Sequence, residues 1–101
     1  MFEKDVEQHL IDRAEALGGT ANKFTSPGRR GLMDRIVMLP IPPEHQEIVA
    51  RYIRFVEVKR PGKRARKLQD FWIRVFRGYG FWAGAVSTPS EVDQLMKEMT
   101  Q

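Results

Sequence analysis

Two side chains of opposite charge, Glu57 and Lys59, lie close together near the end of an apolar segment in "IRFVEVKRPGKRARKLQ", residues 53–69. Because side chains alternate along a strand, both share a face with Phe55. Apolar residues occupy both faces ahead of Glu57, which predicts a central strand covered on both sides. Taken alone, the two residues fit a surface ion pair, which contributes little to stability. Apolar residues on both faces of the strand weaken that interpretation. They favour a second one, in which Glu57 and Lys59 are an acid and a base of a reactive site.

A third candidate, Asp34, stands where a glycine-rich basic loop meets the apolar segment "RIVML". An acid at the start of a strand is often only a turn residue. If this strand pairs with "FVEVK", however, Asp34 and Glu57 converge on one point. Two carboxylates without a Cys or His cluster form a hard-oxygen site, which suits Mg²⁺ or Mn²⁺.

Two further carboxylates, Glu3 and Glu7, fall on or beside the apolar stripe of a helix predicted over residues 2–17. At about 100° per residue the stripe contains Val6, Leu10, Ala14 and Leu17, with Ile11 at its edge. A buried charge is costly without a partner. A metal ion, a Lys or a place at the frayed helix start can each resolve this cost. One or both glutamates can also reach the point shared by Asp34 and Glu57.

Cleavage of a phosphodiester bond needs residues of these types. A cation held by carboxylates polarises the phosphate, lowers the pKa of the attacking water and neutralises developing charge. A Lys beside the cation orients the water or stabilises the transition state electrostatically. Glu57, Lys59 and Asp34 therefore predict a site for cutting a polyanion.

The distribution of charge supports an anionic partner. Residues 51–80 carry ten Lys or Arg against two acids, a net charge of +8, whereas the other residues carry a net charge of −4. Such asymmetry is typical of a nucleic-acid surface. A generic basic face is the alternative. The candidate phosphate contacts are the basic residues of two loops and the following helix start: Arg29, Arg30, Arg60, Lys63, Arg64, Arg66 and Lys67.

The elements that must position these residues follow the order α-β-β-β-α-β-α. Helices are predicted over residues 2–17, over 64–80 and from the capping box that begins at Thr88, with Pro89 and Glu91. Strands are predicted over residues 20–25, 34–40, 52–59 and 81–87. Residues 41–51 allow either a helical turn or a wide loop. The aromatic residues Trp72, Phe76, Phe81 and Trp82 are expected in the core, with a base-stacking platform or a dimer face as alternatives.

Length and composition set the frame for these elements. The chain has 101 residues, so a single domain with one modest core is expected over residues 1–101. It contains no Cys, which excludes disulfides and thiolate metal sites and suits a reducing cytoplasm. No apolar run approaches the roughly 20 residues of a membrane span. The amphipathic, acidic start "MFEKDVEQHL" is unlike a signal peptide.

The ordered pattern "SPG-x-x-G-x-x-DR", then "F-V-E-x-K-x-P-G", then "LQ" resembles the virus-type replication-repair nuclease (VRR-NUC) domain, in its stand-alone bacteriophage form. The resemblance covers about residues 3–96. It implies an α/β fold with a restriction-endonuclease-like PD-(D/E)XK core, a central mixed β-sheet flanked by helices. It also implies a homodimeric Mg²⁺- or Mn²⁺-dependent endonuclease, related to Holliday-junction resolvases, that acts on branched DNA in the host cytoplasm.

The resemblance assigns roles to matching positions. Asp34 and Glu57 would be metal ligands, with the main-chain carbonyl of Val58, and Lys59 would be the catalytic lysine. Gln69 matches a glutamine at the start of the second helix that lies near the site. A glutamate on the first helix completes the set, and Glu3 and Glu7 both remain candidates for it.

Two features depart from the family pattern. "LMD" replaces the usual Pro-Asp, so the rigid residue before the catalytic acid is missing, and little effect is expected because that residue binds no metal. Residues 40–51 are also longer than the usual turn. Two alternatives stay open: a non-catalytic basic nucleic-acid-binding module, and a structural or protein-interaction domain. Neither gives Glu3 or Glu7 a partner.

Overall fold

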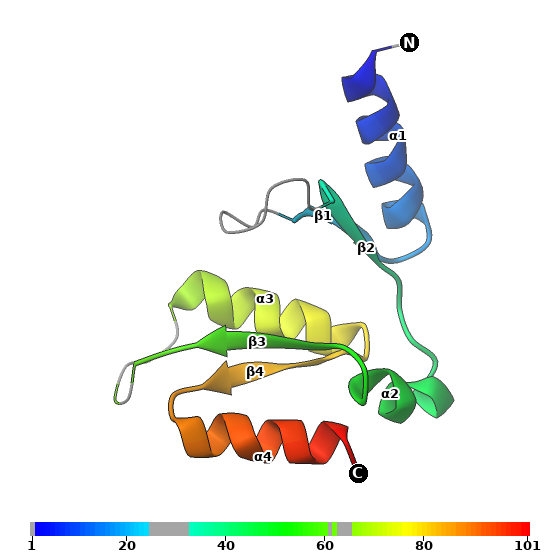
Figure 1. Ribbon diagram of the computed structural model, residues 1–101. Helices are drawn as coiled ribbons and strands as arrows, with labels where there is room; N and C mark the ends of the chain where they lie inside the picture. Colours follow the sequence, from blue (N-terminus) through cyan, green and yellow to red (C-terminus); the bar gives the residue numbers. More distant parts are fainter. Residues whose placement is uncertain (1, 25–32, 61, 63–65) are drawn as a thin grey trace. The chain divides into compact units, whose positions relative to one another are not determined.

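Eight elements follow one another in the computed structural model, which describes residues 2–24, 33–60, 62 and 66–101 (Figure 1). Their bounds are α1 Glu3–Ala16, β1 Thr20–Lys23, β2 Arg35–Met38, α2 Pro43–Ala50, β3 Arg54–Val58, α3 Lys67–Gly78, β4 Trp82–Val86 and α4 Pro89–Met99. The predicted order is confirmed, with α2 added where the sequence allows a helical turn or a loop. The chain is therefore a mixed α/β protein.

The last helix begins as its sequence predicts. The Thr88 hydroxyl accepts a hydrogen bond from the backbone N–H of Glu91 at 3.1 Å. The Glu91 carboxylate in turn accepts from the backbone N–H groups of Ser87 at 2.7 Å and Thr88 at 3.1 Å. These bonds satisfy donors that have no partner inside the helix, and Pro89 stands where no donor is needed. The capping box at the start of α4 is thus confirmed.

The chain divides into two compact units, Met1–Pro40 and Ile41–Gln101, here called the N-terminal and C-terminal units. In the N-terminal unit β1 and β2 pair antiparallel, with Thr20 opposite Met38. Among the described residues of this unit, the buried side chains are Ala14, Ala21 and Met38.

The first helix is less buried than its sequence predicts. Ala14 is buried as expected, but Val6 and Leu17 of the predicted stripe are 55% and 59% exposed. Only Ala14 of α1 is buried, although α1 contacts β1. A two-stranded sheet is too narrow to cover the whole helix, so the helix period located the inward face but not how far it is covered.

The C-terminal unit is built on a parallel pair of strands, β3 and β4, in the register Phe55 to Ala83 and Glu57 to Ala85. Parallel neighbours need a crossover connection, which α3 supplies. Aromatic rings pack together beside α3: Phe55 lies 4.7 Å from Phe76 and 5.5 Å from Phe81, centroid to centroid. Phe76 and Phe81, which were expected in the core, therefore pack on Phe55 but stay partly exposed.

Within the described residues the strands form two separate two-stranded sheets, β1-β2 and β3-β4. A single central mixed sheet with a PD-(D/E)XK core, and a single domain over residues 1–101, stay predictions. None of the described helices is long and apolar enough to cross a membrane.

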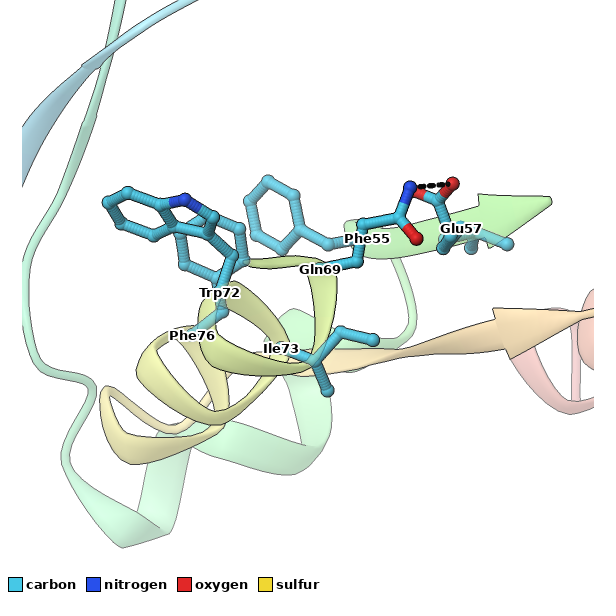
Figure 2. A pocket seen from close by; sticks show the side chains of 7 residues that line it. Phe55, Glu57, Gln69, Trp72, Ile73 and Phe76 are labelled. Atoms are coloured by element: carbon cyan, nitrogen blue, oxygen red, sulfur yellow. Dashed lines mark hydrogen bonds between the residues drawn. The ribbon is translucent and has the colours of Figure 1, made fainter. Parts of the chain in front are cut away.

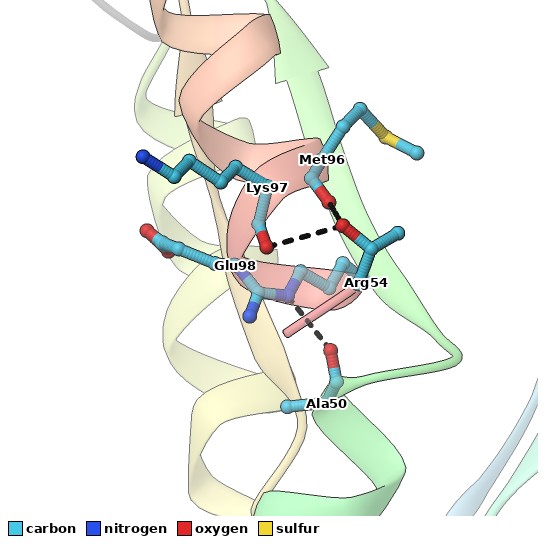
Figure 3. A network of polar contacts seen from close by, with 6 residues as sticks. Ala50, Arg54, Met96, Lys97 and Glu98 are labelled. Carbon is cyan, nitrogen blue, oxygen red and sulfur yellow. Dashed lines mark hydrogen bonds and ion pairs between the residues drawn. The ribbon is translucent and has the colours of Figure 1, made fainter.

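A largely buried arginine side chain contacts several elements of the C-terminal unit (Figure 3). The Arg54 side chain, only 9% exposed, donates to the Ala50 carbonyl at the end of α2 at 2.8 Å. It also pairs with the Glu98 carboxylate of α4 at 3.2 Å. Its guanidinium carbon lies 4.8 Å from the centre of the Trp82 ring, a cation–π arrangement. One side chain on β3 thereby joins α2, β4 and α4.

Replacing Arg54 with Met is expected to lower the free energy of unfolding by about 2 kcal/mol, because one hydrogen bond and a desolvated cation–π contact are lost. Glu98 is 43% exposed, so its ion pair adds little to that sum. Urea unfolding measures the change. The matched control Arg51→Met, on an exposed residue beside α2, should stay within about 0.5 kcal/mol of the parent. Equal losses in both variants would show that Arg54 does not join these elements.

Candidate active site

Three of the predicted site residues form one hydrogen-bonded cluster in the C-terminal unit. Glu57 lies on β3, Lys59 directly follows that strand, and Gln69 stands in the first turn of α3. The Gln69 amide nitrogen donates to Glu57 Oε1 at 2.7 Å, a bond drawn in Figure 2. The Lys59 ammonium donates to Gln69 Oε1 and lies 3.4 Å from Glu57 Oε1. The surface ion pair considered first is therefore present, as one side of a triangle that includes an amide.

The cluster follows from local structure. Strand alternation places Glu57 and Lys59 on one face, and the helical angle of Gln69 directs its side chain toward them. The amide is also oriented by the helix, because Gln69 Oε1 accepts from the backbone N–H of Arg66 at 2.9 Å. With two donors on its oxygen side, the amide presents its nitrogen to the carboxylate. Gln69 thus caps the start of α3 and forms hydrogen bonds to both Glu57 and Lys59.

Burial differs between the two charged members. The Lys59 side chain is 12% exposed and the Glu57 side chain 35%. A largely desolvated ammonium needs acceptors, which Gln69 and Glu57 provide. Both contacts to Glu57 use Oε1, and no described residue donates to Oε2. A carboxylate held on one side and open on the other can bind a cation.

The N-terminal unit holds Asp34, Glu3 and Glu7. Asp34 is exposed, just ahead of β2, and its carbonyl accepts from the Phe24 N–H at 2.9 Å. Glu7 is paired with Arg35, whose Nε donates to it at 2.8 Å and whose second nitrogen bonds the same oxygen. Arg35 also donates to the Ala21 carbonyl at 3.0 Å.

The partner of Glu7 is thus an arginine, whereas a metal ion or a Lys was expected for it. The signal was available, because Arg35 is the first residue of an apolar strand and its charge also needs an acceptor. Glu3 lies exposed in the first turn of α1, which fits the frayed helix start. Ligation of a metal by Glu3 or Glu7 stays a prediction.

The predicted phosphate contacts are described in part. Arg60, Arg66 and Lys67 are exposed, and all three stand in or beside the segment that joins β3 to α3. Arg29, Arg30, Lys63 and Arg64 lie outside the described residues.

The backbone N–H of Lys59 donates a hydrogen bond to the Val86 carbonyl at 2.8 Å, which fixes the end of β3. Metal binding by the Val58 carbonyl stays a prediction.

The donor chemistry of the cluster fits a hard divalent cation, since Glu57 presents carboxylate oxygen and the chain contains no Cys. Among the described residues of either unit, no three acidic or histidine side chains gather at metal-binding spacing. Glu57 can therefore offer one carboxylate to a cation, and metal binding by Asp34 stays a prediction.

Comparison with known proteins adds one relative. The chain is similar to a curated protein named "Putative nuclease p44", from Acyrthosiphon pisum secondary endosymbiont phage 1, with 42% identity over 67 residues. The similar region covers 66% of this chain and 62% of that protein, so the chain spans less than two thirds of its relative. No family model matches the chain, and no solved structure matches it.

Proposed function

We infer that this chain is a metal-dependent endonuclease that hydrolyses phosphodiester bonds in DNA. The observation that carries the proposal is the cluster of Glu57, Lys59 and Gln69 beside exposed arginines. The partly exposed Glu57 carboxylate can bind a cation, and the largely buried Lys59 ammonium beside it can stabilise negative charge. Similarity to a phage protein with nuclease in its name supports the same activity.

The proposed ligands of Mg²⁺ or Mn²⁺ are Glu57, Asp34 and the main-chain carbonyl of Val58, with Glu3 or Glu7 as a further candidate. The bound cation would polarise the scissile phosphate and make the attacking water more acidic. Gln69 keeps Glu57 Oε1 in place, so the carboxylate needs no rearrangement to present its other oxygen. Arg60, Arg66 and Lys67, with the basic residues outside the described part of the chain, would neutralise DNA phosphates, and affinity would fall with salt.

Lys59 would stabilise the charge that develops on the phosphate in the transition state. Its ammonium is already ordered by the Gln69 oxygen and by Glu57, and its burial strengthens electrostatic contacts in this place. A fixed ammonium loses little freedom when the substrate arrives.

Replacing Gln69 with Leu is expected to lower the cleavage rate about 10- to 100-fold, the usual effect of losing a residue that orients a metal ligand. KM for DNA should change little, because Gln69 acts through Glu57 and Lys59. Steady-state cleavage separates the two constants. Gln69→Glu would keep acceptors for Lys59 and Arg66 but set a like charge against Glu57, so it should not restore the rate. The control Gln94→Leu, on an exposed residue of α4, should cleave normally. A rise in KM without loss of rate would contradict this positioning role.

The preferred substrate is proposed to be branched DNA, such as a four-way junction or a flap, cut by a homodimer that presents two sites. The competing proposal is a basic module that binds nucleic acid without cutting it, which the exposed Arg60, Arg66 and Lys67 favour. Labelled duplex, flap and junction DNA, incubated with Mg²⁺ or Mn²⁺ and then with EDTA, separates the two. Cleavage that stops with EDTA supports the nuclease. Salt-dependent binding without cleavage, unaffected by EDTA and by Glu57→Gln, supports the binding module.

A further inference from the structure

A groove of about 260 Å³ starts at the candidate active site and runs between β3 and α3. Its walls include Phe55 from β3 and Trp72, Ile73 and Phe76 from α3. Figure 2 shows Glu57 and Gln69 at one end of the groove and Trp72 and Phe76 at the other. The groove is thus an apolar extension of the proposed catalytic site.

The walls suit a flat aromatic ligand. The centroid of Phe76 lies 4.7 Å from that of Phe55 and 5.7 Å from that of Trp72, so three rings border the space. All of the wall residues named above are partly exposed, and none is fully buried. Pockets for drug-sized ligands begin at roughly 300 Å³. The groove is therefore suited to one ring system and not to a whole nucleotide.

The charges around the groove favour a ligand that carries phosphate outside it. Lys59 stands beside Glu57 at the polar end, and exposed Arg60 and Arg66 stand in the segment between β3 and α3. An aromatic groove next to basic side chains is the arrangement with which proteins bind single-stranded nucleic acid, where bases stack and the backbone meets positive charge.

We propose that the groove takes one unpaired nucleobase of the DNA strand whose phosphate lies at Glu57 and Lys59. The inference rests on the proposed function, and it narrows the substrate to DNA with unpaired nucleotides near the cut. A base inside a continuous duplex must leave its stack to enter, which costs a few kcal/mol, whereas a base at a flap or branch is already free.

The proposal is tested by a substitution that fills the groove with a larger side chain. Ile73→Trp adds bulk inside it, and Leu68→Trp adds the same ring on an exposed position of the same helix that does not line it. Both proteins are titrated, in EDTA so that nothing is cut, with single-stranded and duplex oligonucleotides carrying the fluorescent base 2-aminopurine. Circular dichroism and unfolding curves confirm that each variant is folded.

Ile73→Trp is expected to weaken single-strand binding roughly 5- to 150-fold, the equivalent of one lost base stack, and to leave duplex binding unchanged. Leu68→Trp should bind both as the parent does. Equal binding of single strands by Ile73→Trp and the parent would overturn the proposal. A second result would also overturn the proposal: Ile73→Trp loses stability or changes its oligomeric mass but shows no selective loss of single-strand binding. The groove would then be occupied by other residues of this protein.

Failure of the two proposals can be told apart. If the parent protein binds unpaired bases through the groove but cuts no DNA in Mn²⁺, the nuclease proposal fails and the base site stands. If the parent cuts DNA but Ile73→Trp binds single strands normally, the base site fails and the nuclease proposal stands.

Discussion

Replacing Lys59 with Met should reduce metal-dependent DNA cleavage about 10²- to 10³-fold, the cost of losing one preorganised group that stabilises transition-state charge. Methionine keeps an unbranched apolar stem in a site where the lysine is only 12% exposed, so the fold should survive. DNA binding should change little, because the ammonium is held by Gln69 and Glu57 and is not free on the surface. Single-turnover cleavage and DNA titration in EDTA measure the two effects.

The matched control is Lys67→Met, which removes the same charge from an exposed position on α3. It should weaken DNA binding and its salt dependence slightly, with cleavage of bound DNA unaffected. Equal effects of the two variants on cleavage would mean that Lys59 contributes only general positive charge.

The second large effect on the cleavage rate is expected when Asp34 or Glu57 is replaced. Asp34→Asn and Glu57→Gln should each lower cleavage about 10²- to 10³-fold, and the double variant should be little worse than either, because groups that act as a unit are not additive. This follows from the proposal that both carboxylates hold one cation. The measurement is a double-mutant cycle: cleavage rates of the parent and the three variants at several Mn²⁺ concentrations.

Asp12→Asn is the control in the N-terminal unit, since Asp12 is an exposed residue of α1. It should cleave DNA at the parent rate. If the fold-loss of cleavage rate in the double variant equals the product of the two single losses, Asp34 and Glu57 act independently. That result would contradict the proposed shared cation.

Local signals in the sequence predicted much of the C-terminal unit. Alternation along "FVEVK" placed Glu57 and Lys59 on one face, and the helix period directed Gln69 toward the same place. The Thr88 capping box set the start of α4. Each of these inferences depends on neighbours a few residues apart, for which backbone geometry determines the outcome.

Interactions between distant residues were not predicted. Arg54 reads as one of many basic residues, but it joins Ala50 and Glu98 and stacks on Trp82 in the folded chain. The pairing of Glu7 with Arg35 spans 28 positions. Which cation meets which carboxylate depends on tertiary packing, and periodicity gives no information about it.

For the aromatic residues, too, local packing could be predicted from the sequence and longer-range geometry could not. Phe76 packs on Phe55, as the spacing along "FWIRVF" predicts, but no residue of α3 is buried and Phe71 is 47% exposed. The groove that Trp72 and Phe76 leave open beside Glu57 depends on the distance between α3 and β3, which no local pattern encodes.

The sequence left residues 41–51 open between a helical turn and a loop, because Pro42 and Pro43 interrupt the preceding strand. In the structure Pro42 is the N-cap of α2 and Pro43 its first residue, a position that proline favours.

The central claim, that Glu57 belongs to a metal-dependent nuclease site, is tested most directly by single-turnover cleavage of a labelled four-way junction in Mn²⁺. The parent protein, Glu57→Gln and Glu44→Gln, an exposed glutamate of α2 in the same unit, are compared at matched DNA occupancy. We predict cleavage by the parent and by Glu44→Gln, abolished by EDTA, and at least about a hundredfold slower cleavage by Glu57→Gln. Cleavage at the parent rate by Glu57→Gln would contradict the site, and no cleavage by the parent of junction, flap or duplex DNA would contradict the nuclease itself.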